Sequence, residues 1–179
     1  METLDVFDEN GKVTGEKKLK TEIHRDGDWH RSVHIWIINP KQELLIQKRS
    51  PKKDTSPNMW DISAGGHANA GESEIKSVIR EFEEELGLKL KENYFQYIFT
   101  AKQNSRLSDR IYINNEINPV YLVKKSLDFS KIKLQEDEVA EIKWISWQEL
   151  EEKIKSKNPT YVQYPEEYKK LFEYLRENK

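Results

Sequence analysis

The densest chemistry in the sequence lies in the segment Arg-Glu-Phe-Glu-Glu-Glu-Leu-Gly at residues 80–87. Like charges three or four residues apart destabilise a helix by roughly a few tenths of a kcal/mol, so a helix that gathers glutamates either solvates them or uses them. An advance of about 100° per residue places Glu81, Glu84 and Glu85 on one helix face. Glu83 points elsewhere by the same arithmetic, and we expect it to be solvated. The pattern therefore presents three convergent carboxylates.

Three convergent carboxylates suit a hard divalent cation, because Mg²⁺ or Mn²⁺ would relieve their mutual repulsion. Mg²⁺ takes few protein carboxylates and completes its coordination with water and substrate phosphate oxygens. Arg80 precedes Glu84 by four residues and can pair with it, which would fix the orientation of that carboxylate. The other interpretation is a charged surface helix with incidental glutamates, and this segment by itself leaves both open.

A helix must carry these glutamates, and the apolar pattern around them predicts one. Apolar residues recur at helical spacing at Ile75, Val78, Ile79, Phe82 and Leu86. This stripe lies beside the three carboxylates, and Gly87 marks the end of the helix. The preceding segment Trp-Asp-Ile-Ser-Ala-Gly-Gly-His, residues 60–67, predicts a short strand that runs into glycines. Glycines allow the backbone to approach a metal or a phosphate closely.

The remaining segments predict a mixture of strands and helices. Residues 1–20 predict an N-terminal hairpin around Asn10-Gly11, because that dipeptide favours tight hairpin turns. Strands are predicted within 32–50, as a pair joined near Asn39-Pro40, and within 94–102, 111–125 and 141–147. Residues 51–60 predict a loop, and helices are predicted within 148–156 and over 165–178 of the C-terminal segment 158–179. We expect residues 1–179 to form a single α+β domain, layered αβα around one core.

Composition excludes several classes of function. Lys and Arg number 30 against 32 Asp and Glu, for a net charge of −2, so no general electrostatic attraction to nucleic acid or to a membrane surface is expected. The absence of cysteine excludes disulfides, thiol catalysis and iron–sulfur clusters. The acidic start lacks the layout of a signal peptide. The longest apolar run, near 35–38, is too short to cross a bilayer. A cytoplasmic protein is expected.

The wider spacing around the glutamates carries a specific resemblance. Gly66, five residues, Glu72, seven residues and then Arg-Glu-Phe-Glu-Glu-Glu-Leu-Gly-Leu fit every position of the Nudix box, with Phe82 and Leu88 at its two apolar positions. The chain thus resembles the Nudix hydrolase superfamily over residues 66–88. The resemblance implies an αβα sandwich around a mixed β-sheet.

The resemblance also implies roles for individual residues. Glu81, Glu84 and Glu85 would be the metal ligands, with the carbonyl oxygen of Gly66 as a further one. The chemistry implied is attack of metal-activated water on a diphosphate. Arg80 belongs with Glu84 and Glu85 in the implied catalytic group, and the general base is left open among Glu84, Glu85 and a residue outside the box.

Outside the box, the stretch from Lys20 to about Trp144 is similar to isopentenyl-diphosphate isomerase, which shares the Nudix fold. Three basic residues fall where that enzyme places cations against a diphosphate, namely Lys20, Arg49 and Lys53. Three histidines fall where its metal-binding histidines lie, namely His24, His30 and His67. Glu116 matches one of its further metal-site glutamates and joins the implied catalytic group, whereas Asn114 replaces the other glutamate.

Two departures from the isomerase matter more than these agreements. The isomerase needs a catalytic cysteine in the segment before its histidine, and this chain has Gly65 there and no cysteine anywhere. The isomerase also has a basic residue where this chain has Glu81, and its box is degraded where this one is complete. The sequence therefore predicts an isomerase-like Nudix hydrolase.

The histidines and the basic residues have ordinary structural interpretations as well. His30 and His34 share strand parity with Trp36, so they could form a polar and aromatic layer. His67 abuts the glycine loop and is the better candidate to line the site and to bind substrate. Arg49 is the favoured phosphate ligand, since a guanidinium binds phosphate through two parallel hydrogen bonds. Lys53 and Lys20 are the other predicted substrate contacts.

Taken together, the residues predict a Mg²⁺- or Mn²⁺-dependent hydrolase of a diphosphate linkage in a nucleoside diphosphate or its derivative. One alternative is a prenyl-diphosphate enzyme, either a hydrolase or an isomerase that uses a different acid. The other is a non-catalytic module that binds a diphosphate ligand. The expected partner is a small-molecule diphosphate, with no nucleic acid and no membrane, and a homodimer is left open.

Overall fold

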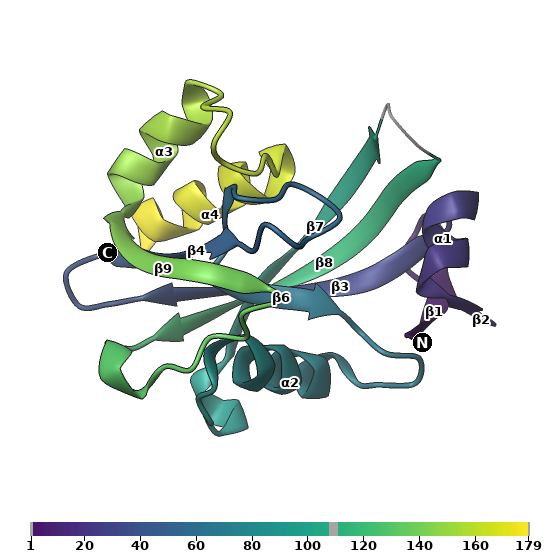
Figure 1. The fold of residues 1–179 in the computed structure, drawn as a ribbon, viewed down its shortest axis with the longest axis horizontal. Coiled ribbons are helices and arrows are strands. Elements are labelled where there is room, and N and C mark those ends of the chain that lie inside the picture. Colours follow the sequence, from purple (N-terminus) through teal and green to yellow (C-terminus); the bar gives the residue numbers. More distant parts are fainter. Residues whose placement is uncertain (1, 108–110, 179) are drawn as a thin grey trace.

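The computed structural model describes residues 2–107 and 111–178, which form a mixed sheet with helices on both faces (Figure 1). The strands are β1 (Thr3–Phe7), β2 (Val13–Leu19), β3 (Trp29–Ile38), β4 (Glu43–Arg49), β5 (Trp60–Asp61), β6 (Ala64–His67), β7 (Gln96–Leu107), β8 (Tyr112–Lys124) and β9 (Val139–Ser146). The strand β3 is the hub of the sheet, since it pairs with β1, β4, β6 and β8. Its pairing with β8 is parallel, whereas the other three are antiparallel.

Two cores lie on the two faces of this sheet. The helix α2 (Glu74–Leu86) covers one face and packs Val78, Phe82 and Leu86 against β3 residues such as Ile35. The helices α3 (Trp147–Lys155) and α4 (Pro165–Glu177) cover the opposite face around Trp36 (Figure 1). The predicted αβα sandwich with a mixed sheet is confirmed. Alternating residues of β3 supply both cores, because successive side chains of a strand point to opposite faces.

The N-terminal hairpin predicted around Asn10-Gly11 is confirmed. The strands β1 and β2 pair in antiparallel register, and the Asp8 carboxylate accepts the backbone N–H groups of Asn10 and Lys12 at 2.9 Å each. A helix that the sequence did not predict follows directly, α1 (Lys20–Asp26). It ends at Gly27, whose φ of 76° is the left-handed conformation that glycine adopts without strain.

The C-terminal helix covers Pro165–Glu177, close to the predicted 165–178 and shorter than the whole C-terminal segment 158–179. Residues 158–164 run as an irregular segment that bridges to β5 through Trp60 and Tyr161, and α4 begins only at Pro165. Residues 1 and 179, the ends of the two predicted appendages, lie outside the described residues. The single strand predicted over 60–67 is also interrupted, giving β5 and β6. Between them the Ser63 hydroxyl donates to the carbonyl of Leu45 at 2.6 Å.

Candidate active site

Two glycines on β6 bring the strand against the glutamates of α2. A Cβ atom built on Gly66 would lie 2.5 Å from the carboxylate of Glu81, and one built on Gly65 would lie 2.4 Å from the carbonyl of Val33. No other side chain fits these two positions without displacing its neighbours. The glycines therefore allow close packing of β6 against Glu81 and β3, whereas their predicted approach to a metal or a phosphate stays a prediction. The Gly66 carbonyl, predicted as a metal ligand, accepts the Ser32 hydroxyl at 2.8 Å.

The carboxylate cluster, defined as Glu81, Glu84 and Glu85, runs from a buried to an exposed end. Glu85 is buried, and its Oε2 accepts the Gly65 N–H at 2.9 Å and the Gln47 amide at 3.3 Å. Burial, together with the charge of Glu81, raises the pKa of Glu85 to about 8. Burial likewise raises the pKa of Glu81. Glu84 is the accessible member, with 49% of its side chain exposed.

Arg80 stands among these acids as their internal counterion. Its guanidinium donates to Glu81 at 2.6 Å and to Glu84 at 3.0 Å, so the predicted pairing with Glu84 is confirmed. It also donates to both oxygens of Glu72, at 3.1 and 3.0 Å, and to the His67 carbonyl at 2.8 Å. Burial opposes its charge, but the hydrogen bond to Glu72 and the charge of Glu81 outweigh that and raise its pKa. Arg80 thereby links α2 to β6 by a hydrogen bond.

The carboxylate cluster fits a hard divalent cation on the chemistry of its donors. Its members offer oxygen atoms alone, which are the ligands that Mg²⁺ and Mn²⁺ prefer. The raised pKa values of Glu81 and Glu85 show that their negative charges lack full compensation in the protein itself. A bound cation would supply that compensation.

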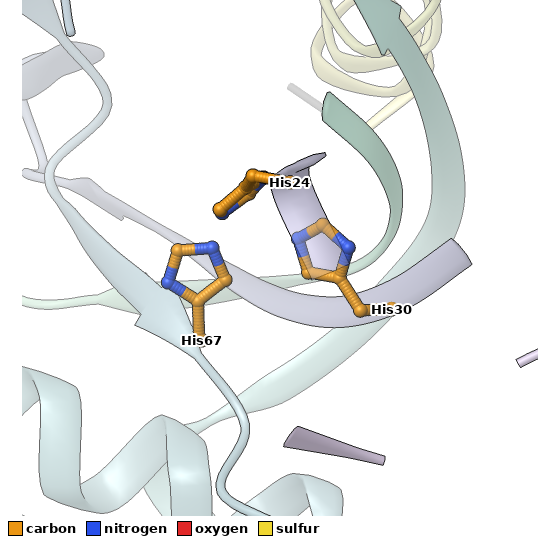
Figure 2. A group of neighbouring side chains, drawn as sticks. All are labelled: His24, His30 and His67. Carbon is orange, nitrogen blue, oxygen red and sulfur yellow. The ribbon is translucent and has the colours of Figure 1, made fainter. Parts of the chain in front are cut away.

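The histidine cluster is defined as His24, His30 and His67, and two of its members, His24 and His67, line the same pocket as the glutamates. Figure 2 shows the three rings turned toward one another from α1, β3 and β6. One ligand atom from each ring lies within 4.8 Å of the others. The Nε2 atoms of His30 and His67 are buried without a hydrogen-bond partner. Unpaired buried nitrogens of this kind fit a metal ion of intermediate softness, such as Zn²⁺ or Co²⁺.

Two rings of this cluster, His24 and His30, are in surroundings that favour the neutral form. Burial, followed by the charge of His30, lowers the pKa of His24 to about 4. Burial also lowers the pKa of His30 to about 4, against the opposing charge of Glu116. A neutral imidazole is the form that binds a metal. The outer nitrogens are held by backbone carbonyls, since Nδ1 of His24 lies 3.3 Å from the oxygen of Ile113 and Nδ1 of His30 lies 3.1 Å from that of Asp28.

Glu116 lies beside the histidine cluster, as the sequence predicted. Its Oε1 is 3.5 Å from Nε2 of His67 and 3.8 Å from Nε2 of His30. Burial would raise the pKa of this carboxyl, but the close approach and charge of His67 reverse the effect and lower it. Glu116 therefore remains an anion and adds an oxygen donor to the three rings. Asn114 is buried nearby on β8, and its side-chain oxygen has no partner.

The three predicted phosphate-binding cations line the pocket, but each is already paired. Arg49 donates to Asp61 at 2.9 Å and to the carbonyl and hydroxyl oxygens of Thr55 at 3.0 Å each. Lys53 pairs with Glu138, and Lys20 donates to Glu2 at 2.9 Å. A phosphate must therefore share these cations with their acidic partners.

One pocket of about 850 Å³ unites the two clusters. Its wall also contains His34 from β3 and Tyr164 from the segment before α4, neither of which was assigned to the site from the sequence. His34 and His30 lie an even number of positions apart along β3, and this spacing was the sequence feature that could have assigned His34 to the site. In the described residues, no helix has the length and the apolar character needed to span a membrane.

Comparison with known proteins adds an independent line of evidence. The model of the NUDIX domain family matches residues 28–165. Nudix hydrolase 3 of Arabidopsis thaliana is 42% identical over 181 residues, and the alignment covers 98% of this chain but 23% of that relative. The chain thus spans less than a quarter of that protein's length.

Two further comparisons concern the isomerase resemblance and the fold. An isopentenyl-diphosphate Delta-isomerase of Pectobacterium atrosepticum is 32% identical over 116 residues, covering 65% of this chain and 62% of the relative. DR0079 from Deinococcus radiodurans, a protein of known crystal structure, superposes with a TM-score of 0.68 over 98% of both chains. At 20% identity this last likeness shows the fold alone.

Proposed function

Since the chain belongs to the Nudix domain family, we propose that it is a metal-dependent hydrolase of a diphosphate linkage in a nucleoside diphosphate or a derivative of one. The observation that carries the proposal is the carboxylate cluster, complete in the family's motif and open to a polar pocket of about 850 Å³. A pocket of this volume is large enough for a nucleotide-sized molecule.

The metal would be held by Glu81, Glu84 and Glu85, with the Gly66 carbonyl as a further oxygen. Mg²⁺ or Mn²⁺ supplies charge neutralisation for the diphosphate and lowers the pKa of an attacking water. Arg80 orients Glu81 and Glu84 through its hydrogen bonds, and the Gly65 N–H fixes Glu85. The chain's own residues thus set the position of every carboxylate in the cluster.

The hydrolysis itself exchanges one bond at phosphorus for another. The water oxygen bonds to phosphorus, the bridging P–O bond breaks, and the leaving phosphate keeps the bridging oxygen and its electrons. We assign proton acceptance from the water to the Glu84 carboxylate, because it is the exposed member of the cluster. Glu85, held beneath Gly65, serves as a fixed ligand. Arg49, Lys53 and Lys20 contact the phosphates by sharing their charge with Asp61, Glu138 and Glu2.

The histidine cluster gives the pocket a second metal position. The Nε2 atoms of His30 and His67, the ring of His24 and the carboxylate of Glu116 would hold this cation. The same cluster supports a second candidate function, cleavage of a prenyl diphosphate, because relatives of this chain are named isopentenyl-diphosphate isomerases. Isomerisation itself is disfavoured, since the chain has no cysteine.

The test is phosphate release from a panel of nucleoside diphosphates, nucleotide sugars, dinucleotides, coenzyme A and isopentenyl diphosphate. Wild type is compared with Glu84→Gln and with the matched control Glu83→Gln, whose side chain pairs with Lys89 on the solvent side. We expect turnover with Mg²⁺ or Mn²⁺ that is lost with chelator and in Glu84→Gln, and retained in Glu83→Gln. Absence of turnover on every substrate, with the protein folded, would refute the proposal.

A further inference from the structure

A buried ion pair joins the centre of the sheet to the C-terminal helix. Nδ1 of His34 on β3 lies 2.6 Å from the carboxylate of Glu167 on α4, and the other oxygen of Glu167 accepts the Trp36 indole N–H at 2.8 Å. His34 and Glu167 are 4% and 2% exposed. Within the described part of the chain, the His34 ring has its one hydrogen bond to Glu167. Nε2 is therefore the ring nitrogen left to meet a ligand.

His34 faces the pocket that holds the two clusters. It lines that pocket, whereas Trp36 and Glu167 belong to the layer behind it. In the sheet, His34 pairs with Gly65, the residue whose N–H holds Glu85. His34 is thus one strand away from the place where the diphosphate would be cleaved. A group attached to the diphosphate would reach it without leaving the pocket.

The groups around His34 are polar and carry no surplus positive charge. Its ring lies edge-on to Tyr164, with the ring centroids 5.0 Å apart. The Tyr164 hydroxyl donates to Asp61 at 3.3 Å, and Asp61 in turn pairs with Arg49. The His34–Glu167 pair and the Arg49–Asp61 pair each sum to zero charge. The carboxylate of Glu116 lines the same pocket and also acts on His34, raising its pKa. This wall therefore offers no surplus positive charge to a further anion, and it suits a neutral polar group.

Glu167 keeps the His34 ring in its donor form. Burial opposes the charge on this ring, but the charge and hydrogen bond of Glu167 outweigh it and raise the pKa of His34 to about 9. Both ring nitrogens then carry hydrogen, and Nε2–H is a fixed donor on the pocket side.

Anchoring of α4 does not by itself explain the ion pair. Apolar residues of similar size serve as well or better for stability at buried positions, because the desolvation of two charges offsets their attraction. The surrounding core, with Trp36, Tyr168 and Phe172, already packs α4 onto the sheet. A charged His34 ring is useful at this position if it contacts a ligand in the pocket.

We propose that His34 is a specificity-determining residue that donates a hydrogen bond from Nε2 to an uncharged hydroxyl or carbonyl oxygen on the group attached to the diphosphate. Glu167 is its positioning residue. This inference rests on the proposed function and narrows it to substrates whose attached group carries oxygen, such as a ribose or a base. A hydrocarbon group would leave the buried N–H unpaired, and sites built to hydrogen-bond a substrate reject analogues that lack the partner.

The experiment compares three diphosphates that differ in the attached group. They are a nucleoside diphosphate chosen from ADP, GDP, CDP and UDP, isopentenyl diphosphate, and inorganic pyrophosphate, which has no attached group. The main variant is the double substitution His34→Leu/Glu167→Gln, which removes both charges together and leaves an acceptor for Trp36. His34→Gln retains an N–H donor and serves as the conservative variant. Trp36→Phe is the structural control, since it removes the other hydrogen bond of Glu167 away from the pocket.

The proposal predicts a change in selectivity. In the double variant, KM for the nucleoside diphosphate rises by about tenfold or more, whereas kcat/KM for pyrophosphate stays within about twofold and that for isopentenyl diphosphate is unchanged or higher. His34→Gln recovers part of the loss, and Trp36→Phe lowers the melting midpoint without altering selectivity. Parallel losses on all three substrates, or no loss on any, would overturn the proposal.

Failure of the proposed function can be distinguished from failure of this inference. Calorimetric binding of the same nucleoside diphosphate and of pyrophosphate, in a Glu84→Gln background, reads recognition without turnover. If wild type hydrolyses nothing but the His34 variants lose nucleoside diphosphate binding selectively, the specificity role stands and the hydrolase assignment falls. If wild type hydrolyses a nucleoside diphosphate and binding ignores His34, the reverse holds.

Discussion

The carboxylate cluster shares a pocket with His24 and His67 of the histidine cluster, but the two clusters are stabilised differently when no metal is bound. Glu81 and Glu84 share a built-in cation, since Arg80 donates to both. Burial lowers the pKa of His24 and His30 and so favours their neutral form, and in the described residues the Nε2 atoms of His30 and His67 make no hydrogen bond. One site is therefore partly satisfied by the protein, and the other leaves lone pairs buried.

This difference predicts two kinds of metal binding. At the carboxylate cluster a cation competes with Arg80 for the same oxygens, so binding is weak and strengthens when substrate phosphates add ligands. The ring nitrogens of the histidine cluster lie next to the Tyr112 hydroxyl, 3.3 Å from Nε2 of His24, and the Glu116 carboxylate, 3.5 Å from Nε2 of His67. Neither neighbour is a cation that a metal must displace, so we expect a transition metal to be held tightly and without substrate. We expect the first cation to arrive with the substrate and the second to be resident.

The largest expected effect is at Glu85, where activity and stability should move in opposite directions. Glu85→Gln removes a ligand, and we expect kcat/KM with Mg²⁺ to fall about a thousandfold, or roughly 4 kcal/mol. The same change removes a buried carboxylate whose pKa is raised from 4.5 to about 8. Since the folded state disfavours that charge, the metal-free variant should melt above wild type at pH 8. Steady-state kinetics and thermal unfolding in chelator measure the two effects.

The control for this prediction is Glu83→Gln, which changes the exposed neighbour and should alter neither quantity by more than a small amount. A metal-free Glu85→Gln protein that melts below wild type would show that the Glu85 charge is already compensated by the protein. The carboxylate cluster would then not need a metal to compensate its charge, and the proposed difference between the two clusters would be wrong.

Substitution of Arg80 tests the expectation that this residue neutralises the carboxylate cluster and competes there with a metal. Arg80→Met leaves Glu72, Glu81 and Glu84 without their shared donor, which should lower the free energy of unfolding in chelator by about 2–3 kcal/mol. Mg²⁺ should restore more stability to this variant than to wild type, because the competing cation is gone. Denaturant unfolding with and without Mg²⁺ measures both. Arg25→Met is the matched control, since Arg25 pairs with Asp26 at the surface, where such pairs contribute little to stability.

Substitution of His30 tests the expectation that the histidine cluster holds a metal without substrate. His30→Gln should weaken Zn²⁺ or Co²⁺ binding by at least about a hundredfold, the upper end of what changes around a metal site cost. Calorimetric titration of the metal-stripped protein, without substrate, gives the affinity and the stoichiometry. Glu85→Gln should keep this binding, because it alters the other cluster. If both variants lose it equally, the pocket holds one coupled metal site in place of two.

The sequence predicted the carboxylate cluster better than its surroundings because the cluster is local. Helical spacing alone brings Glu81, Glu84 and Glu85 together. Contacts across the chain could not be predicted in this way, and the pair His34–Glu167 is separated by 133 residues. The predicted phosphate ligand Arg49 likewise has Asp61 and Thr55 as partners, which only the folded loop reveals.

The helix α1 was missed for a different reason. Its seven residues contain one buried apolar side chain, Ile23, so no helical periodicity exists to detect. The helix is set by its ends, where Glu22 accepts the N–H of Leu19 at 3.2 Å and Gly27 turns the chain. His24 was therefore assigned to the site through resemblance, without the element that positions it.

The smallest expected effect is on the pH dependence of stability, because the two clusters oppose each other. His24 and His30 have pKa values lowered from 6.5 to about 4 in the folded state. The unfolded chain therefore binds more protons between these values, and the histidine cluster loses stability as pH falls from about 6.5 to 4. Glu85, with its pKa raised to about 8, gains stability as pH falls from about 8 to 4.5.

Single variants separate the two opposing slopes. In chelator, Glu85→Gln should make the melting midpoint fall more steeply than wild type as pH drops from 6.5 to 4. His30→Gln should make it fall less steeply. Saturating Zn²⁺ competes with protons for the rings, so it should move the acid loss of wild type to lower pH. Melting curves at half-unit pH steps decide the matter. Parallel curves for wild type and both variants would mean that the two clusters share one electrostatic environment.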